Sequence, residues 1–489
     1  MIFRGKRGRW LALFVLVGVV SMGISWLSPH AARGDDQPTM EQADPPKPSS
    51  GAERMGQNFL PDPKGGSRFQ GVIGYFVLIG IAYAVSRKRK EVLWRPVIFG
   101  LALQALFALI VLNPVVGQFF FNVVDVGVRR LLSFAEAGID FVMQSTVPHQ
   151  VTFTNGGPMT TEVFIGRTSP VLKNFAFWIL PTVIFFSSMI TMLYHLGIMQ
   201  VIVKGLSRAM VYAMGTSGSE TLSCTANVFV GQTEAPLLVR PFIGKMTQSE
   251  LMAVMTGGFA TVAGGVLAIY VSMLKGIPGI AGHLVTASIM AAPCALAVSK
   301  LMYPETEESA TAGSLKLEVD RPDSNVIEAA ARGATEGMGL VLNITAVLIG
   351  FVGLVTLFNA IIGLVGFSLE GILGWILRPL AWSMGVPWGE ANLVGQLLGE
   401  KLVLTELIAY LHLKSVLQGG TAMLSKRSAV IASYSLCGFA NVASIGIQIG
   451  GIGGMAPERR GELARLGLFA MFAGAIVSCL SGTIAGFFV

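Results

Sequence analysis

Two glutamates, Glu234 and Glu406, stand in apolar regions of the chain, where an ionised side chain is costly. A carboxylate at the centre of a bilayer costs roughly 2.5–3.5 kcal/mol on insertion scales, so a chain keeps one there when it is paired, hydrated or functional. Glu234 directly follows Gln232 and Thr233. Glutamine both donates and accepts hydrogen bonds, whereas ionised glutamate only accepts them. The run Gln232–Glu234 could therefore bind the edge of a flat heterocycle that carries donors and acceptors.

An alternative is that these polar groups lie at the tip of a hairpin and merely satisfy one another. Lys401, which lies five residues before Glu406, also has two readings. It is either a charge partner for a nearby acid or a helix-end lysine whose ammonium reaches the membrane interface.

Other kinds of chemistry find little support in the sequence. The four cysteines all lie in apolar segments without CxxC spacing, which indicates small packing residues rather than a metal or disulfide framework. His195 and His283 have no second ligand at metal spacing, so we expect both to be packed or interfacial. There is no His-Glu-x-x-His or Gly-x-Ser-x-Gly motif. We therefore expect a protein that is not an enzyme and needs no cofactor.

The composition indicates an integral membrane protein. Of 489 residues, 53% are hydrophobic and 13% are charged, against about 25% charged in soluble proteins. The helices of a large soluble enzyme would show charged faces, and these segments do not. The net charge of +7 would suit nucleic acid, but the basic residues gather beside apolar spans, for example at 87–90 and 459–460. That distribution is typical of cytoplasmic loops, so we expect no nucleic-acid partner.

Eight segments are predicted to span the lipid bilayer, since a helix of about 20 apolar residues crosses its hydrocarbon layer. They are 71–86, 93–112, 175–203, 251–273, 283–302, 337–365, 429–449 and 466–489. Residues 1–32 are predicted to be either a signal peptide or an N-terminal membrane helix, and residues 33–67 a disordered extracytoplasmic linker. Small and polar residues interrupt the apolar pattern at 215–241 and 369–413. We interpret both regions as re-entrant hairpins, since broken backbone at membrane depth is tolerated where it lines a protein cavity.

An internal repeat relates the two halves of the chain. Residues 258–263 read Gly-Phe-Ala-Thr-Val-Ala and residues 438–443 read Gly-Phe-Ala-Asn-Val-Ala, identical at five of six positions. Each copy follows an interrupted region with a glutamate, and the predicted topology runs the two copies in opposite directions. Inverted repeats with broken helices are typical of secondary transporters. Chance similarity of two small apolar words is the alternative.

Two longer sequence segments resemble signatures of the concentrative nucleoside transporter family. One is the run 231–241, Gly-Gln-Thr-Glu-Ala-Pro-Leu-Leu-Val-Arg-Pro, and the other is 436–441 continuing into 444–451. The likeness extends from about residue 71 to the C-terminus. The chain departs from the family motif Gly-x-Lys-x-x-x-Asn-Glu-Phe at Thr405 and Leu407, which replace Asn and Phe. Thr lacks the paired donor and acceptor of an amide, so this departure bears on the second hairpin and on the sugar site.

The resemblance implies an all-α homotrimer with a scaffold domain and a transport domain that moves like an elevator. Residues 68–203 would be mostly scaffold, 204–303 the first repeat of the transport domain, 304–368 a cytoplasmic loop and a scaffold span, and 369–489 the second repeat. The implied activity is uptake of nucleosides across the inner (plasma) membrane, coupled to Na⁺. Proton coupling, an intramembrane enzyme and a non-transporting sensor on the same fold are the alternatives.

The resemblance also implies roles for eleven residues. The nucleobase would contact Gln232, Thr233, Glu234 and, through an apolar contact, Val266. The ribose would contact Glu406, Asn441 and Ser444. The implied Na⁺ ligands, some through backbone carbonyls, are Asn227, Val230, Thr261 and Val262.

Overall fold

The computed structural model describes residues 59–61, 66–143, 149–150, 163–164, 174–274, 277–312, 323–419 and 423–488. The predicted signal or anchor at 1–32 and most of the predicted linker at 33–67 lie outside these residues. The regular secondary structure of the described part is helical apart from a two-residue strand pair, β1 (His149–Gln150) with β2 (Val163–Phe164), and one isolated bridge between Leu60 and Ser425.

The first half of the chain forms the elements α3 (Gly66–Ala84), η1 (Arg89–Glu91), α4 (Trp94–Val111), α5 (Pro114–Met143), the π-helical turn η2 (Phe175–Ile179), α6 (Thr182–His195), α7 (Ile198–Met214), α8 (Gly218–Ala226), η3 (Ala235–Val239), α9 (Arg240–Ile243), α10 (Gln248–Ala260), α11 (Gly264–Met273) and α12 (Ile280–Met302).

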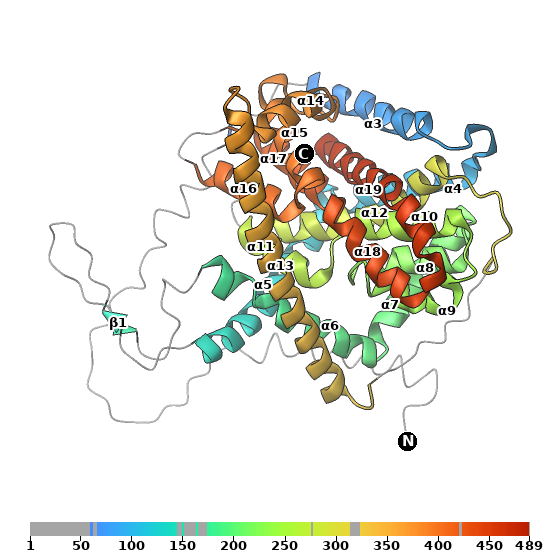
Figure 1. Cartoon of the computed structure of the whole chain (residues 1–489), viewed down its shortest axis with the longest axis horizontal. Coiled ribbons are helices and arrows are strands. Elements are labelled where there is room, and N and C mark those ends of the chain that lie inside the picture. Colours follow the sequence, from blue (N-terminus) through green and yellow to red (C-terminus); the bar gives the residue numbers. More distant parts are fainter. Residues whose placement is uncertain are drawn as a thin grey trace. The chain divides into compact units, whose positions relative to one another are not determined.

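The second half forms α13 (Val326–Gly363), α14 (Leu369–Ser383), α15 (Trp388–Val403), α16 (Glu406–Gln418), α17 (Lys426–Leu436), α18 (Val442–Met455), η4 (Pro457–Arg459) and α19 (Arg460–Phe488). Figure 1 shows this succession of helices.

Six segments of the described chain are long and apolar enough to cross a membrane. They are Trp94–Val111, Phe175–His195, Gln248–Met273, Ile280–Met302, Val326–Gly363 and Pro457–Phe488. The predicted span 71–86 falls in the shorter apolar helix α3, and the predicted span 429–449 is divided between α17 and α18. The predicted span 175–203 ends early, because Gly197 takes a left-handed φ of 82° and separates α6 from α7. The chain is thus an all-helical membrane protein.

The helix α13 is 38 residues long and unbroken (Figure 1). Its buried residues are Ala329, Gly333, Gly337 and Val341, which recur every fourth position. They pack on α6, where a Cβ at Gly337 would lie 2.8 Å from Cα of Ile184. Small residues at this spacing let two helices approach closely in lipid. The rest of α13 exposes large apolar side chains, which suits a surface covered by lipid or by another chain.

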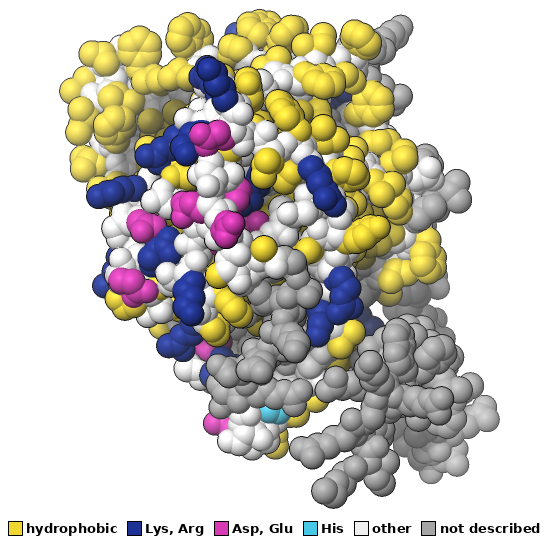
Figure 2. Space-filling model, turned by 90° about the vertical axis from the view of Figure 1, so that its right-hand side faces the viewer, with side chains coloured by type: hydrophobic (Ala, Val, Ile, Leu, Met, Phe, Trp, Pro, Cys, Tyr) yellow, Lys and Arg dark blue, Asp and Glu magenta, His cyan; other side chains and the backbone are white. Residues whose placement is uncertain are grey.

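One face of the molecule separates polar from apolar surface (Figure 2). Lys, Arg, Asp and Glu side chains gather in one zone of that face, while apolar side chains cover its upper part.

A buried ion cluster at the end of α12 joins three segments. The Lys300 Nζ lies 2.8 Å from Glu220 Oε2 on α8 and 2.9 Å from Glu305 Oε2 in the loop that follows α12. This cluster fixes the start of α8 against the end of α12.

Candidate functional site

Two helices break inside the protein, and the breaks touch. The first helix is helical to Ala260 and resumes at Gly264, and the second is helical to Leu436 and resumes at Val442. At the second break Gly438 has a φ of 115°, and a Cβ there would lie 2.8 Å from the carbonyl oxygens of Phe259 and Ala260. Only glycine adopts this backbone at so close an approach without strain. The two copies of the repeated word therefore contact each other at their breaks.

Three residues with a predicted role at the sugar come together at the second break. Glu406 is buried at the start of α16, and its Oε2 accepts a hydrogen bond from Asn441 Nδ2 at 2.8 Å. Asn441 Oδ1 in turn accepts from the backbone N–H of Ser444 at 2.8 Å, which caps α18. The other carboxylate oxygen of Glu406 accepts from the Tyr270 hydroxyl at 2.7 Å. The Tyr270 ring stacks on Tyr410 with centroids 4.4 Å apart.

Thr405, which departs from the family motif, is the N-cap of α16. Its hydroxyl accepts a hydrogen bond from the N–H of Ile408 at 3.4 Å and so caps α16. Thr is an accepted N-cap residue, and the cap places Glu406 in the first turn. Leu407 is buried beside it.

The residues with a predicted role at the nucleobase lie between α8 and α9, against α10 and α18. Gln232 is buried, and its Oε1 accepts from Gln448 Nε2 at 3.0 Å. Gln448 Nε2 also donates to the Met255 carbonyl at 3.1 Å. A Cβ at Gly258 would lie 2.7 Å from Gln448 Nε2 and 3.0 Å from Gln232 Cβ, so this glycine gives the two amides their room.

The neighbouring predicted residues occupy different environments. Thr233 packs on α18, where a Cβ at Gly451 would lie 2.7 Å from Thr233 Cγ2. Glu234 is exposed, and its carboxylate folds back over Gly231, where a Cβ would lie 2.1 Å from Glu234 Oε2. Val266 is buried in α11, just after the first break. Glu234 is thus more accessible than its neighbour Gln232.

The cluster around Glu406 and the cluster around Gln232 both include a residue of α18, namely Ser444 in the first and Gln448 in the second. Ser444 and Gln448 are four residues apart, so they lie on one face of that helix, separated by about one turn or 5.4 Å. The sequence motifs pointed to Ser444 but assigned no role to Gln448 or Tyr270. Gln448 could have been noticed as a lone amide in the apolar run 445–449. Tyr270 carries no such signal, because an aromatic residue in an apolar helix resembles any packing residue.

A second group of predicted residues surrounds an amide with unmet hydrogen-bonding needs. Asn227 is fully buried at the end of α8, and neither its Oδ1 nor its Nδ2 has a hydrogen-bond partner in the described part of the chain. Val230, Thr261 and Val262 are also buried, and the loop after α8 meets the first break where Gly264 N–H donates to the Phe229 carbonyl at 3.3 Å.

The donor set at this position suits a hard cation. An orphaned buried amide is expensive unless something pairs with it, and amide and backbone carbonyl oxygens are ligands that hard cations accept. Among the described residues, no cluster of three or more His, Cys, Asp or Glu side chains could hold a metal ion. The residues present therefore fit an alkali ion better than a transition metal.

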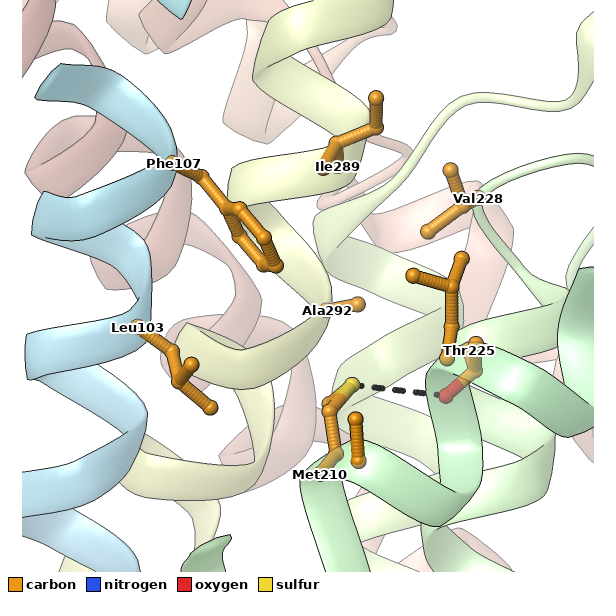
Figure 3. A pocket seen from close by; sticks show the side chains of 9 residues that line it. Leu103, Phe107, Met210, Thr225, Val228, Ile289 and Ala292 are labelled. Atoms are coloured by element: carbon orange, nitrogen blue, oxygen red, sulfur yellow. Dashed lines mark hydrogen bonds between the residues drawn. The ribbon is translucent and has the colours of Figure 1, made fainter. Parts of the chain in front are cut away.

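A small cavity of about 50 Å³ lies apart from these residues, between α4, α7, α8 and α12 (Figure 3). Its walls are apolar except for Thr225, whose hydroxyl lies 3.6 Å from Met210 Sδ. None of the predicted site residues lines it. We therefore assign it no part in the site.

Comparison with known proteins gives matches over most of the chain. Residues 283–486 match the family model "Na+ dependent nucleoside transporter C-terminus", residues 73–146 match the corresponding N-terminus model, and residues 176–276 match a model described as "Nucleoside recognition". The chain is 42% identical over 427 residues to an uncharacterized transporter of Haemophilus influenzae, a match that covers 86% of this chain and 97% of that protein.

Two further similarities extend this result. The chain is 39% identical over 437 residues to sodium/nucleoside cotransporter 1 of Mus musculus, which covers 86% of this chain and 63% of the mouse protein. The solved structure of CNTnw in an inward-facing substrate-bound state is 38% identical, with a TM-score of 0.76, and the match covers 86% of this chain and 98% of that one.

Proposed function

Since the chain belongs to the concentrative, Na⁺-dependent nucleoside transporter family, whose members are transporters and not enzymes, we propose that it takes up nucleosides across the inner (plasma) membrane in symport with Na⁺. The observation that carries the proposal is the pair of polar clusters on α18. Asn441 at the start of α18 binds Glu406 of α16, and Gln232 meets Gln448 about two turns further along α18, or roughly 10 Å. A nucleoside joins a sugar and a base over a similar separation.

Each cluster has the chemistry of one half of that substrate. The Glu406 carboxylate accepts hydrogen bonds from sugar hydroxyls, and the Asn441 amide both donates and accepts. Ser444 adds a hydroxyl on the same helix. At the other end Gln232, Thr233 and Glu234 bind the polar edge of the base, and Val266 contacts its face.

The orphaned amide of Asn227 supports Na⁺ as the coupling ion. Asn227 Oδ1 and the Thr261 hydroxyl, with backbone carbonyls of Val230 and Val262, would hold the ion at the first break. A bound cation there stabilises the first hairpin (residues 218–243) against α10. Nucleoside binding is strengthened because that hairpin carries Gln232.

We further propose the architecture of an elevator. The arms of both hairpins are short: α8 has 9 residues and α16 has 13, so they extend about 14 and 20 Å at 1.5 Å per residue. Neither arm crosses a hydrocarbon layer about 30 Å thick, which favours re-entrant hairpins. Residues 204–303 and 369–489 form the transport domain, and residues 68–203 with 304–368 are mostly scaffold. The exposed apolar surface of α13 supports homotrimer assembly.

Uptake into proteoliposomes tests the function. Radiolabelled uridine and adenosine are expected to accumulate under an inward Na⁺ gradient, and Glu234→Gln is expected to abolish accumulation while the protein still inserts. Glu307→Gln, which neutralises an exposed loop glutamate, is the matched control and is expected to transport normally. Uptake that persists in sodium-free buffer at fixed pH and collapses with a protonophore would establish proton coupling instead. Normal uptake by Glu234→Gln would remove this residue from the site.

A further inference from the structure

Lys401 is a buried cation in the second hairpin (residues 388–418), and oxygens of the backbone surround it. It is 2% exposed on α15, and its Nζ donates to the Ser435 carbonyl at 2.8 Å and more weakly to the Cys437 carbonyl at 3.4 Å. The ion pairs found among the described residues do not include Lys401. Burial excludes the reading of Lys401 as a helix-end lysine that reaches the interface. Its charge interacts with that of the nearby Glu406, but no salt bridge joins the two side chains.

The position of this ammonium is electrostatically distinctive. Ser435 and Cys437 lie at the C-terminal end of α17, next to the second break. The last carbonyls of a helix lack partners within the helix and form the negative end of its dipole. Ser478 Oγ also donates to the Cys437 carbonyl, at 2.7 Å. The side chains of α15 and α19 thus replace the hydrogen bonds that α17 loses where it ends.

The corresponding arm of the first hairpin lacks such a residue. The repeated words align Thr261 at the first break with Asn441 at the second. The arm that precedes the first break, residues 218–230, contains no lysine or arginine, and it carries the unpartnered Asn227 amide instead. The second break is therefore neighboured by the ammonium of Lys401. Near the first break lies the Asn227 amide oxygen, which no cationic side chain of the arm 218–230 contacts.

We propose that the Lys401 ammonium is the fixed counterpart, in the second repeat, of the Na⁺ that binds in the first. It holds the end of α17 so that Asn441, four residues after Cys437, reaches Glu406. Lys401 is thus a positioning residue for the sugar site, and the chain binds one Na⁺ and not two. This inference rests on the proposed Na⁺-coupled nucleoside transport.

Ion counting on the purified full-length protein tests the inference. The melting temperature is measured against Na⁺ concentration without nucleoside, since its dependence on ion concentration reports ions bound to the folded state. Unaltered protein is expected to show the dependence of a single ion, and a two-ion dependence would overturn the inference. This readout does not need nucleoside binding, so a failure of the proposed substrate is seen separately, as no binding of uridine or adenosine.

Two substitutions at Lys401 separate its charge from its volume. Lys401→Met fills the same space without charge, and is expected to weaken uridine binding at least tenfold at saturating Na⁺. Lys401→Ala leaves room at the same carbonyls, and the Hill coefficient for Na⁺ in uridine binding is expected to rise from about 1 toward 2. A purely structural role would change neither the steepness nor the number of ions. Uridine binding within twofold of the unaltered protein in Lys401→Met, or unchanged steepness in Lys401→Ala, would refute the inference.

Discussion

Replacement of Glu406 by glutamine removes the charge at the proposed sugar site and keeps the shape of the side chain. The present carboxylate accepts from Asn441 Nδ2 at 2.8 Å and from the Tyr270 hydroxyl at 2.7 Å. In Glu406→Gln the new amide oxygen still accepts from Asn441, and the new amide nitrogen donates to Tyr270, whose hydroxyl both donates and accepts. We therefore expect the fold to survive the change.

The magnitude follows from the loss of charge on the acceptor. A hydrogen bond to a charged group contributes about 1.5–3 kcal/mol, against about 0.5–1.5 kcal/mol for a neutral pair. The difference, about 1–1.5 kcal/mol for each sugar hydroxyl, corresponds to roughly five- to twelvefold in affinity. Two hydroxyls on the carboxylate would weaken uridine binding by up to about 150-fold.

Isothermal titration with uridine, 2′-deoxyuridine and 3′-deoxyuridine measures this effect one hydroxyl at a time. The unaltered protein is expected to discriminate against at least one deoxy analogue, and Glu406→Gln to bind that analogue and uridine with more similar affinity. Glu400→Gln is the matched control, because Glu400 is a buried carboxylate of the same hairpin that pairs with His412 Nδ1 at 2.7 Å. Undiminished discrimination in Glu406→Gln, or an equal loss in Glu400→Gln, would refute the assignment of the sugar site.

Three further predictions concern the ion, the break and the loop. Asn227→Ala is expected to lose the Na⁺-dependent rise in melting temperature. In the unaltered protein, Na⁺ at 100 times its Kd stabilises the folded state by about 2.7 kcal/mol. An undiminished rise in the variant would place the ion elsewhere. Gly438→Ala is expected to cost more than 2 kcal/mol of stability, because left-handed strain of about 1–2 kcal/mol adds to the carbonyl clash, whereas Gly446→Ala, with no atom within 4 Å of its Cβ, is the neutral control; equal melting temperatures would contradict this. Burial raises the pKa of Glu305, but Lys300 at 2.9 Å outweighs it and holds that pKa below its ordinary 4.5. The stability that ionised Glu305 contributes is therefore present above pH 4.5 and lost as pH falls further. Below pH 4.5 the melting temperature of Glu305→Gln is expected to depend less on pH than that of the unaltered protein. The same pH dependence in both proteins would exclude a stabilising pair of Glu305 with Lys300.

Sequence motifs predicted that Glu406, Asn441 and Ser444 act together, because all three lie in distinctive motifs, and the structure brings them together. Asn441 belongs to the repeated segment 438–443, Ser444 belongs to the family signature at 444–451, and Glu406 is a costly charge in an apolar region, so each carries a signal of its own. The partners that orient them do not. Tyr270 is 136 residues from Glu406 along the chain, and only the fold shows that its hydroxyl reaches the carboxylate.

The boundaries of the spans show a different limit of the sequence. The run 175–203 contains no charged residue and reads as one span, yet Gly197 ends α6 through a left-handed backbone. A glycine in an apolar run is compatible with either outcome, since close packing and chain reversal both use it. The neighbours of Lys401 were also hidden, because backbone carbonyls at a helix end leave no trace in residue types.

The contact of Gly438 with the carbonyls of Phe259 and Ala260 has a thermodynamic consequence. Thr261 directly follows Ala260, and Asn441 lies three residues after Gly438, so the proposed ion at the first break and the proposed sugar at the second would perturb one shared piece of backbone. Linkage between two ligands is reciprocal: the factor by which Na⁺ tightens nucleoside binding is also the factor by which nucleoside tightens Na⁺ binding. Couplings of this kind are typically about 1–3 kcal/mol. A transporter with this reciprocal coupling binds each ligand more tightly once the other is bound, and so favours the state that carries both across the membrane.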